Sequence, residues 1–288
     1  MRENHPVSAR HARYLGADGS GRKGQARIMR LAVLSDIHGN QVALQAVLAD
    51  LQQAGGADRI WILGDLVMAG PRPVECLHMI RDLQAASPKT VEVIGGNTDR
   101  YVVTGQRRAE KIETADDWAN YPKRQRWIGE RFSQMAEKLS WADAEYLKKT
   151  LGRELELNVP GYGWVIGFHA MPGDDELFFE LNTPDDILLD SLYEREGRLA
   201  LCGHTHHRMD RDLGQWRLIN VGSVGLPNDD PRASYAILTF DGDQVTVDLR
   251  LVPFDSEAVI ADMNAQQHPD RDWVAQVLRN GKAARPTI

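Results

Sequence analysis

The sequence predicts an α/β fold, because strand-loop-helix units repeat early in the chain. Short apolar runs at Leu31–Leu34 and Arg59–Leu63 have the composition of buried strands. Amphipathic segments at Gln41–Gln53 and Pro73–Ala86 follow them and have the periodicity of helices. A third strand is expected at Thr90–Ile94. Such a repeat predicts parallel strands with helices packed on the outside.

The rest of the chain departs from this repeat. The segment Ala115–Thr150 has a helical pattern and is rich in aromatic residues and arginine. Three later segments, Arg217–Val221, Tyr235–Phe240 and Val245–Val252, predict a hairpin-rich second half. The C-terminal stretch Asp255–Arg279 predicts one or two helices.

These patterns predict one folded domain over residues 29-288, with residues 100-162 as a helical insertion or cap. Residues 1-28 are rich in Gly, Ser, Arg and Ala with little apolar periodicity, which predicts a disordered N-terminal tail. The tail has no apolar core of a signal peptide, and no run is long enough to span a membrane. We therefore expect a cytoplasmic protein without a membrane partner, in which Cys76 and Cys202 are buried thiols in a reducing compartment.

Composition also limits the partners. The chain has 288 residues and a net charge of −7, which argues against a general nucleic-acid binder, so no stable nucleic-acid complex is expected. An acidic protein needs a local positive field to hold an anionic substrate. Bound divalent cations would supply that field.

A series of polar motifs follows the predicted strands. Carboxylate, imidazole and amide oxygen are ligands for hard or borderline metals, and open α/β sheets bind ligands at the carboxyl ends of their strands. Seven such ligands are enough for two divalent ions if one carboxylate bridges them, and an ion pair of this kind makes hydroxide at neutral pH and clamps a phosphoryl group. The motifs are Asp36-Ile37-His38, Gly64-Asp65, Gly96-Asn97, His169 and Gly203-His204-Thr205-His206.

Each of these residues also has a structural interpretation when taken singly. Asp65 and Asn97 are acceptable turn residues, and a lone His169 is more often structural than a ligand. His204 and His206 have the i, i+2 spacing of strand residues that face one way. For Asn40 a helix N-cap is the favoured interpretation, with a phosphate contact as a secondary role. Together, the residues favour a metal centre.

In this order the motifs resemble the calcineurin-like metallophosphoesterase superfamily, and in particular its bacterial phosphodiesterase and diadenosine-tetraphosphatase-like branch. The run from Asn220 to Pro227 and the Arg232–Tyr235 segment are similar to the same branch. The resemblance covers Met29 to about Val252. It implies a four-layer α/β/β/α sandwich of two mixed sheets flanked by helices, with a helical insertion.

The resemblance also implies a role for each motif. Hydroxide between two divalent metal ions would attack phosphorus, and Mn, Fe, Co, Ni and Zn all suit the nitrogen and oxygen donors. One ion would be held by Asp36, His38 and His206, the other by Asn97, His169 and His204, and Asp65 would bridge them.

The chain departs from the family pattern in two places. After Gly-Asn the family usually carries a histidine that protonates the leaving group, but Thr98 stands here. His207 is one candidate replacement, although an exposed strand residue is the favoured interpretation. Met68-Ala69 stands where the Ser/Thr protein phosphatases carry Asp-Arg, which disfavours that activity. The residues expected to contact substrate are Asn40, Asn97, Thr98 and His207.

The sequence therefore predicts a dinuclear metal-dependent phosphoesterase. The expected substrate is a phosphodiester or phosphoanhydride, such as a nucleotide or dinucleoside polyphosphate. A phosphomonoesterase or protein Ser/Thr phosphatase is the alternative. A non-catalytic scaffold of the same fold is disfavoured because all seven ligand positions are filled. The aromatic and basic insertion could stack a base, although core packing is favoured for any single residue.

Overall fold

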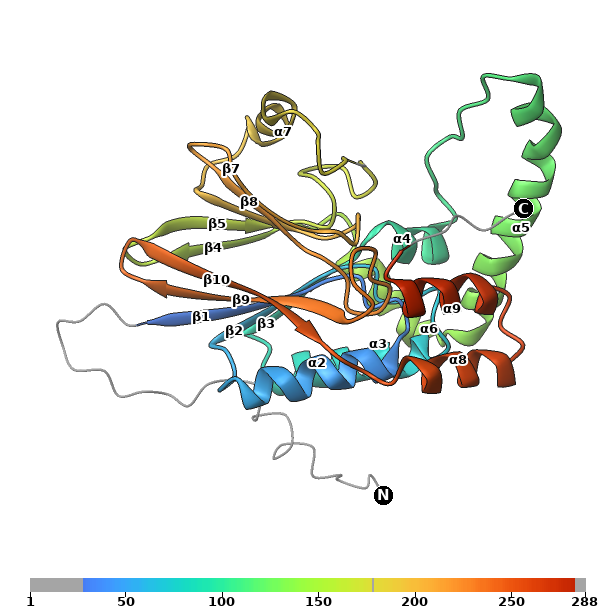
Figure 1. Cartoon of the computed structure of the whole chain (residues 1–288), viewed down its shortest axis with the longest axis horizontal. Coiled ribbons are helices and arrows are strands. Elements are labelled where there is room, and N and C mark those ends of the chain that lie inside the picture. Colours follow the sequence, from blue (N-terminus) through green and yellow to red (C-terminus); the bar gives the residue numbers. More distant parts are fainter. Residues whose placement is uncertain (1–27, 178, 283–288) are drawn as a thin grey trace.

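The computed structural model describes residues 28–177 and 179–282. Two mixed five-stranded sheets pack face to face, and helices cover their outer faces (Figure 1). This arrangement confirms the predicted four-layer α/β/β/α sandwich. Apart from Ile28, the predicted disordered tail at 1-28 lies outside the described residues.

The first sheet contains the strands of the early repeat. Strand β1 pairs in parallel with β2, and β2 pairs in parallel with β3. The C-terminal hairpin joins the same sheet, because β9 pairs antiparallel with β1 and with β10. The order is β10 (Gln244–Val252), β9 (Ala233–Asp241), β1 (Met29–Leu34), β2 (Arg59–Leu63) and β3 (Val91–Ile94).

The second sheet has three parallel central strands between two antiparallel edges. Strand β6 pairs in parallel with β5 and β8, while β4 and β7 run antiparallel to their neighbours. The order is β4 (Leu155–Val159), β5 (Gly163–Gly167), β6 (Leu199–Cys202), β8 (Arg217–Val221) and β7 (Arg208–Asp212).

Alternation along each central strand divides the core into layers. Val33 and Leu63 belong to the cluster between the sheets, whereas Leu34 and Ile62 pack toward the helices of the first sheet. In β6, Leu201 faces the first sheet and its neighbour Cys202 faces outward. Strands buried on both faces therefore appear in the sequence as continuous apolar runs.

Helices complete the outer layers. Helices α2 (Gln41–Gln53) and α3 (Pro73–Ala86) cover the first sheet, and α7 (Asp185–Leu192) covers the second. The two predicted C-terminal helices are α8 (Ser256–Ala265) and α9 (Arg271–Asn280), which share a separate apolar cluster.

The predicted insertion is helical, and its longest helix projects beside the sandwich. It contains α5 (Ala115–Lys138), whose only buried residue is Met135, and α6 (Trp141–Thr150), which packs against α3 (Figure 1). Strand β4 lies within the predicted boundary 100-162, yet it belongs to the second sheet. The boundary of the insertion itself stays a prediction.

Cys76 and Cys202 are buried, free and located in different apolar clusters, so the prediction that both are buried thiols is confirmed. Among the described residues, no helix combines the length and apolar character that a bilayer crossing requires.

Candidate metal centre

The predicted ligands lie in loops at the carboxyl ends of strands in both sheets. Five of them adopt left-handed backbone conformations, which non-glycine residues seldom adopt. Strain of this kind clusters at functional sites, because the surrounding structure has to hold it in place. The φ angles are 56° for Asp36, 49° for His38, 52° for Asp65, 66° for His204 and 60° for His206. The interpretation of His204 and His206 as strand residues is therefore wrong.

Backbone hydrogen bonds hold these loops together. The amide of Asp36 donates to Gly64 O at 3.0 Å, and the amide of His38 donates to Asp65 O at 2.9 Å. The pairing of β1 with β2 thus continues into the loops that follow them. The side chain of Asp99, which is fully buried, accepts from the amides of Leu66, Val67 and Gly96, and so fixes the loop after β2 against α4 (Asn97–Thr104).

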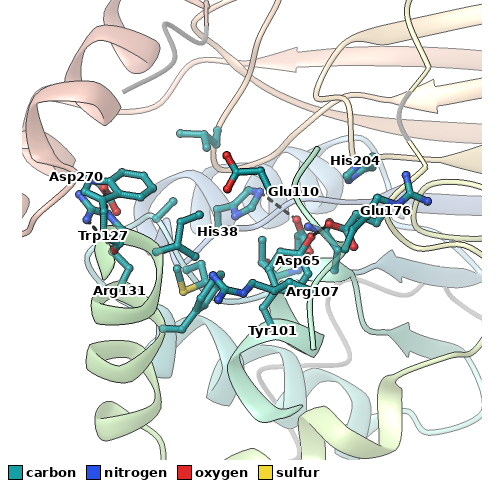
Figure 2. Close-up of a pocket in the computed structure, with 18 of the residues that line it drawn as sticks. His38, Asp65, Tyr101, Arg107, Glu110, Trp127, Arg131, Glu176, His204 and Asp270 are labelled. Carbon is teal, nitrogen blue, oxygen red and sulfur yellow. Dashed lines mark hydrogen bonds and ion pairs between the residues drawn. The ribbon is translucent and has the colours of Figure 1, made fainter. Parts of the chain in front are cut away.

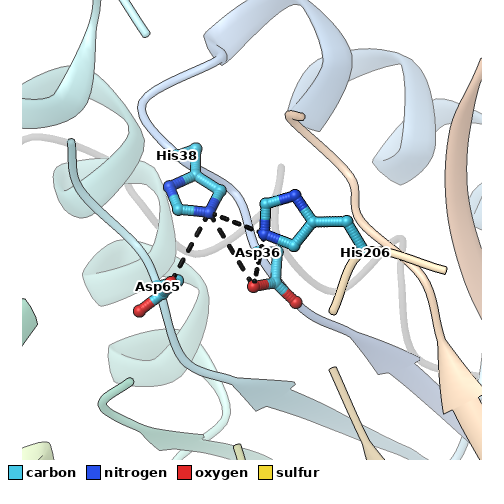
Figure 3. A group of neighbouring side chains, drawn as sticks. All are labelled: Asp36, His38, Asp65 and His206. Atoms are coloured by element: carbon cyan, nitrogen blue, oxygen red, sulfur yellow. Dashed lines mark hydrogen bonds and ion pairs between the residues drawn. The ribbon is translucent and has the colours of Figure 1, made fainter. Parts of the chain in front are cut away.

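The first cluster consists of two carboxylates and two imidazoles (Figure 3). His206 Nε2 lies 3.1 Å from Asp36 Oδ1 and 3.1 Å from His38 Nε2. His38 Nε2 lies 3.8 Å from Asp36 Oδ1 and 3.5 Å from Asp65 Oδ2. The four donor atoms lie within 4.8 Å of one another, so one cation could contact all of them.

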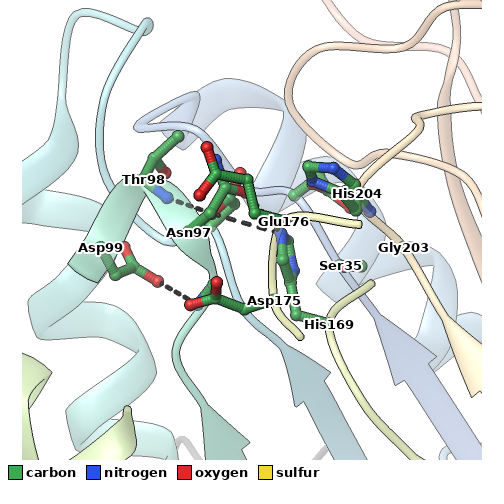
Figure 4. A network of polar contacts seen from close by, with 12 residues as sticks. Ser35, Asn97, Thr98, Asp99, His169, Asp175, Glu176, Gly203 and His204 are labelled. Atoms are coloured by element: carbon green, nitrogen blue, oxygen red, sulfur yellow. Dashed lines mark hydrogen bonds and ion pairs between the residues drawn. The ribbon is translucent and has the colours of Figure 1, made fainter. Parts of the chain in front are cut away.

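The second cluster lies on the other side of Asp65 (Figure 4). His169 Nε2 lies 3.0 Å from Asn97 Oδ1 and 3.5 Å from Asp65 Oδ1. The ring of His204 stands edge-on to that of His169, with centroids 5.2 Å apart. Asp65 therefore presents Oδ2 to the first cluster and Oδ1 to the second, which is the placement of a bridging carboxylate.

Carbonyl oxygens orient two of the imidazoles. His169 Nδ1 lies 2.7 Å from Leu63 O, and His206 Nδ1 lies 2.5 Å from Leu226 O. A carbonyl can only accept, so Nδ1 carries the hydrogen in each ring. In the neutral ring Nε2 then presents its lone pair, which is the usual arrangement for a metal-ligating histidine.

The charges of the site also suit cations. Asp36 Oδ1 and His38 Nδ1 are buried without a hydrogen-bond partner among the described residues. Burial lowers the pKa of His38 and His204 to about 4, which keeps both rings neutral. Burial also opposes protonation of His169, but the adjacent Asp65 raises its pKa to about 10. A bound cation would replace that proton as the partner of Asp65.

Two glycines lie so close to the carboxylates that a side chain at either position would overlap a carboxylate oxygen. A Cβ on Gly96 would lie 2.3 Å from Asp65 Oδ1, and one on Gly203 would lie 2.3 Å from Asp36 Oδ2. Neither position tolerates a side chain without moving a carboxylate. The glycines of the Gly-Asn and Gly-His motifs are thus part of the site for a steric reason.

A cavity of about 920 Å³ lies above both clusters (Figure 2). Its floor contains His38, Asp65, Asn97, His204 and His206. Its wall comes from α4, α5, the loop between them, the loop after β5 and α9. Part of the predicted insertion therefore does border the site. The wall residues include Tyr101, Arg107, Tyr121, Trp127, Arg131, Phe132, Glu176 and Trp273.

The residues expected to contact substrate are placed differently from one another. Asn97 and Thr98 line the cavity, whereas Asn40 caps α2: its Oδ1 accepts from Ala43 N at 3.1 Å and its Nδ2 donates to Gly225 O at 2.9 Å. His207 is half-buried and precedes β7, so its interpretation as an exposed strand residue is wrong. Its Nε2 lies 2.7 Å from Asn228 Nδ2 at the cavity edge. Substrate contacts of Asn40 and His207 stay predictions.

Sequence reasoning missed Tyr101 and Glu176 in the cavity wall. The Tyr101 hydroxyl donates to Glu176, and Arg100 pairs with Asp175 at 2.7 Å and with Glu176 at 2.8 Å. These contacts join α4 to the loop after β5. Tyr101 and Glu176 are far apart in sequence and neither belongs to one of the motifs, so no local pattern indicated them.

A sandwich of two mixed sheets with aspartate and histidine clusters at its strand ends is the architecture of metal-dependent phosphoesterases. Residues 29–243 match the calcineurin-like phosphoesterase superfamily domain, and the chain belongs to this superfamily. It is therefore a hydrolase that acts on phosphoester bonds.

Several relatives match this chain over most of its length. An uncharacterized protein of Methanocaldococcus jannaschii is 30% identical over 268 residues, which is 88% of this chain and 98% of that protein. A metallophosphoesterase of Sphaerobacter thermophilus superposes with a TM-score of 0.63 at 26% identity, covering 88% of this chain and 100% of its own. A hypothetical protein of Pyrococcus horikoshii has a TM-score of 0.68 at 23% identity over 89% and 99% of the two chains, and shows the same fold.

A shorter match has a named activity. The symmetrical bis(5'-nucleosyl)-tetraphosphatase of Thioalkalivibrio sulfidiphilus is 30% identical over 88 residues. The match spans 31% of this chain and 31% of that enzyme.

Proposed function

We propose that the chain binds two divalent metal ions and hydrolyses a phosphodiester or a phosphoanhydride. One observation carries the proposal. The seven predicted ligands gather at one end of the sandwich, beneath a single cavity, with Asp65 between the two clusters. The ions would be held by Asp36, His38 and His206 on one side and by Asn97, His169 and His204 on the other.

The ions, when bound, supply Lewis acidity toward water and toward the phosphoryl oxygens. The chain's own residues position the reaction. Asp65 would hold both ions, and the carbonyls of Leu63 and Leu226 orient His169 and His206. The amide of Thr98 donates to Asp65 Oδ1 at 2.9 Å and so holds this carboxylate in place.

A nucleotide or dinucleoside polyphosphate is the proposed substrate class. The short match to the tetraphosphatase supports a nucleotide-type substrate. The cavity supports it as well, because Tyr121, Trp127 and Phe132 offer apolar rings in the same wall as several arginines. Aromatic rings stack bases, and arginines pair with phosphates.

A substrate screen tests this proposal. The protein is freed of metal with a chelator and then assayed with Mn²⁺ on bis(p-nitrophenyl) phosphate, p-nitrophenyl phosphate, nucleoside triphosphates and dinucleoside polyphosphates. Metal-dependent hydrolysis of the diester or the phosphoanhydrides, well above that of the monoester, supports the proposal. Equal activity without metal contradicts it. Manganese as the native ion and a cytoplasmic location stay predictions.

A further inference from the structure

Four arginines around the cavity are paired with carboxylates. Arg131 pairs with Asp270 at 2.5 Å, Arg108 with Asp174 at 2.6 Å and Arg124 with Glu110. Arg100 pairs with Asp175 and Glu176. Each of these charges is thus neutralised by a carboxylate, as expected in a protein with a net charge of −7.

Arg107 has no carboxylate partner among the described residues. Its Nη2 donates to the neutral Oε1 of Gln125 at 3.3 Å, and its guanidinium lies over the Phe132 ring at 5.5 Å from the centroid. Nη1 is buried and has no acceptor in the described part of the chain. A buried charged donor costs free energy when it makes no hydrogen bond. We therefore expect Nη1 of Arg107 to donate to an anionic group of a ligand.

The position of Arg107 places that partner in the substrate cavity. Arg107 lies in the loop between α4 and α5 and lines the same cavity as His38 and Asp65 (Figure 2). It is neither a predicted metal ligand nor a neighbour of one in sequence. An anion bound by Arg107 would therefore lie in the same cavity as the reacting phosphorus.

A second buried donor without an acceptor indicates which kind of ligand the cavity suits. Trp273 Nε1, on α9, lines the same cavity and is buried without an acceptor in the described residues. Outside the metal centre, the unpartnered buried atoms of the described residues are therefore both donors. Such a wall suits a ligand that brings only acceptors, and phosphoryl oxygens are acceptors that a guanidinium binds in pairs.

We propose that Arg107 binds a second, non-reacting phosphoryl group of the substrate, so that the enzyme selects molecules with at least two linked phosphoryl groups. This inference rests on the proposed function, because it assigns the reacting phosphoryl group to the metal centre. It goes further by assigning the selection for a phosphate chain to one side chain. Trp273 Nε1 is a further, neutral donor in the same cavity.

The test compares two inorganic probes that bind without turnover. Isothermal titration of the metal-loaded protein with imidodiphosphate and with orthophosphate, in excess free Mn²⁺, gives the ratio of their affinities. In Arg107→Met, which removes the donors but keeps the length, we expect imidodiphosphate to bind about 10- to 100-fold more weakly, as for loss of a charged hydrogen bond. Orthophosphate should bind within about 2-fold of the wild type, since it needs only the metal centre.

Two further variants complete the design. Arg107→Lys keeps the charge but loses the paired donors, and it should give an intermediate ratio. Arg126→Met removes an exposed arginine of the neighbouring helix α5 and should leave the ratio unchanged.

An unchanged ratio in Arg107→Met overturns the proposal, as does an equal loss of affinity for both probes, which would show a merely structural arginine. If the wild type selects imidodiphosphate through Arg107 but hydrolyses no phosphoester or phosphoanhydride, the subsite stands and the proposed function fails.

Discussion

The Nε2 atoms of His38 and His206 lie 3.1 Å apart, and both are within 4 Å of Asp36 Oδ1. Because the Nδ1 hydrogen of His206 is directed at a carbonyl, its Nε2 lone pair faces the other ring. Two ring nitrogens this close need a proton or a cation between them. With the carboxylate beside them, a divalent cation would satisfy all three groups at once, so we expect this pair to belong to the proposed metal centre.

The glycine before Asn97 is expected to be essential for the centre. Gly96→Ala places a Cβ 2.3 Å from Asp65 Oδ1 and 2.7 Å from His169 Cε1, so the proposed bridge between the sites is displaced. We expect at least about a 10²-fold loss of kcat, because the proposed metal pair would supply most of the catalysis. Gly129→Ala is the control: nothing lies within 4 Å of its Cβ, and alanine suits the interior of α5. Normal kcat in Gly96→Ala would contradict this steric account.

Trp127 is expected to contact the base of a nucleotide substrate. It lines the cavity, whereas Trp118 is 64% exposed and stacks on Tyr121. Trp127→Ala should raise KM for nucleotides by about 10- to 100-fold, from a stacking energy of roughly 1–3 kcal/mol, and should raise KM for a small aryl diester much less. Trp118→Ala is the matched control and should change neither value. If Trp127→Ala affects both substrates equally, Trp127 packs the wall and does not recognise the base.

Thr98 predicts a strong dependence on the leaving group. An alkoxide leaves phosphorus poorly without a proton donor, which typically contributes about 10²–10⁴-fold, and Thr98 cannot act as an acid near pH 7. We therefore expect aryl diesters and phosphoanhydrides to be preferred over alkyl monoesters. A plot of log kcat/KM against leaving-group pKa should have a steep negative slope in the wild type and a flatter one in Thr98→His.

A shallow slope in the wild type would mean that another acid is present. His207→Ala is then the informative variant, because His207 lies beside Asn228 at the edge of the cavity. A slope that steepens in this variant would identify His207 as the proton donor. An unchanged slope would exclude it.

Asp50 is expected to make stability depend on pH. It pairs with Arg250 at 2.6 Å and accepts from the Tyr235 hydroxyl at 2.7 Å, and these contacts lower its pKa although burial opposes the shift. The folded-state pKa is thus below the unfolded value of about 3.9, so the contribution is present above that value and is lost as pH falls through the folded-state pKa. We expect Asp50→Asn to lower the free energy of unfolding by about 1–3 kcal/mol at pH 7.

The measurement is the difference in unfolding free energy between Asp50→Asn and the wild type as a function of pH. The difference should shrink below about pH 4. Asp248→Asn is the control, because Asp248 pairs with the same Arg250 at 2.7 Å but its side chain is 55% exposed and the pair should contribute little. A pH-independent effect of Asp50→Asn would show that the hydrogen-bonded charge is not its cause.

The sequence predicted the fold and the floor of the site because both depend on local patterns. Buried strands appear as apolar runs, and each predicted ligand follows such a run. The ligands therefore meet where the carboxyl ends of these strands lie side by side. The left-handed conformations of Asp36 and His204 were not predictable, because tertiary hydrogen bonds impose them. Strand β7 (Arg208–Asp212) was missed as well, since its charged edge lacks the apolar alternation of a strand.

The wall of the cavity was less predictable. The insertion was expected to border the site, but the sequence did not separate Trp127, which lines the cavity, from Trp118, which does not. Neither did it indicate that Arg107 lacks a carboxylate partner within the described part of the chain while its neighbour Arg108 has one. Both distinctions depend on how the loop after α4 packs against residues distant in the sequence.

The most direct test of the metal centre is the number of ions per chain. We expect mass-spectrometric metal analysis after reconstitution and desalting to give about two ions per chain for the wild type. Asp65→Asn should hold about one or fewer and lose at least about 10³-fold in kcat, because the proposed bridge is lost. Asp243→Asn, at the exposed β9–β10 turn, should match the wild type in both respects. Two ions and normal kcat in Asp65→Asn, or no bound ions in an active wild type, would contradict the account.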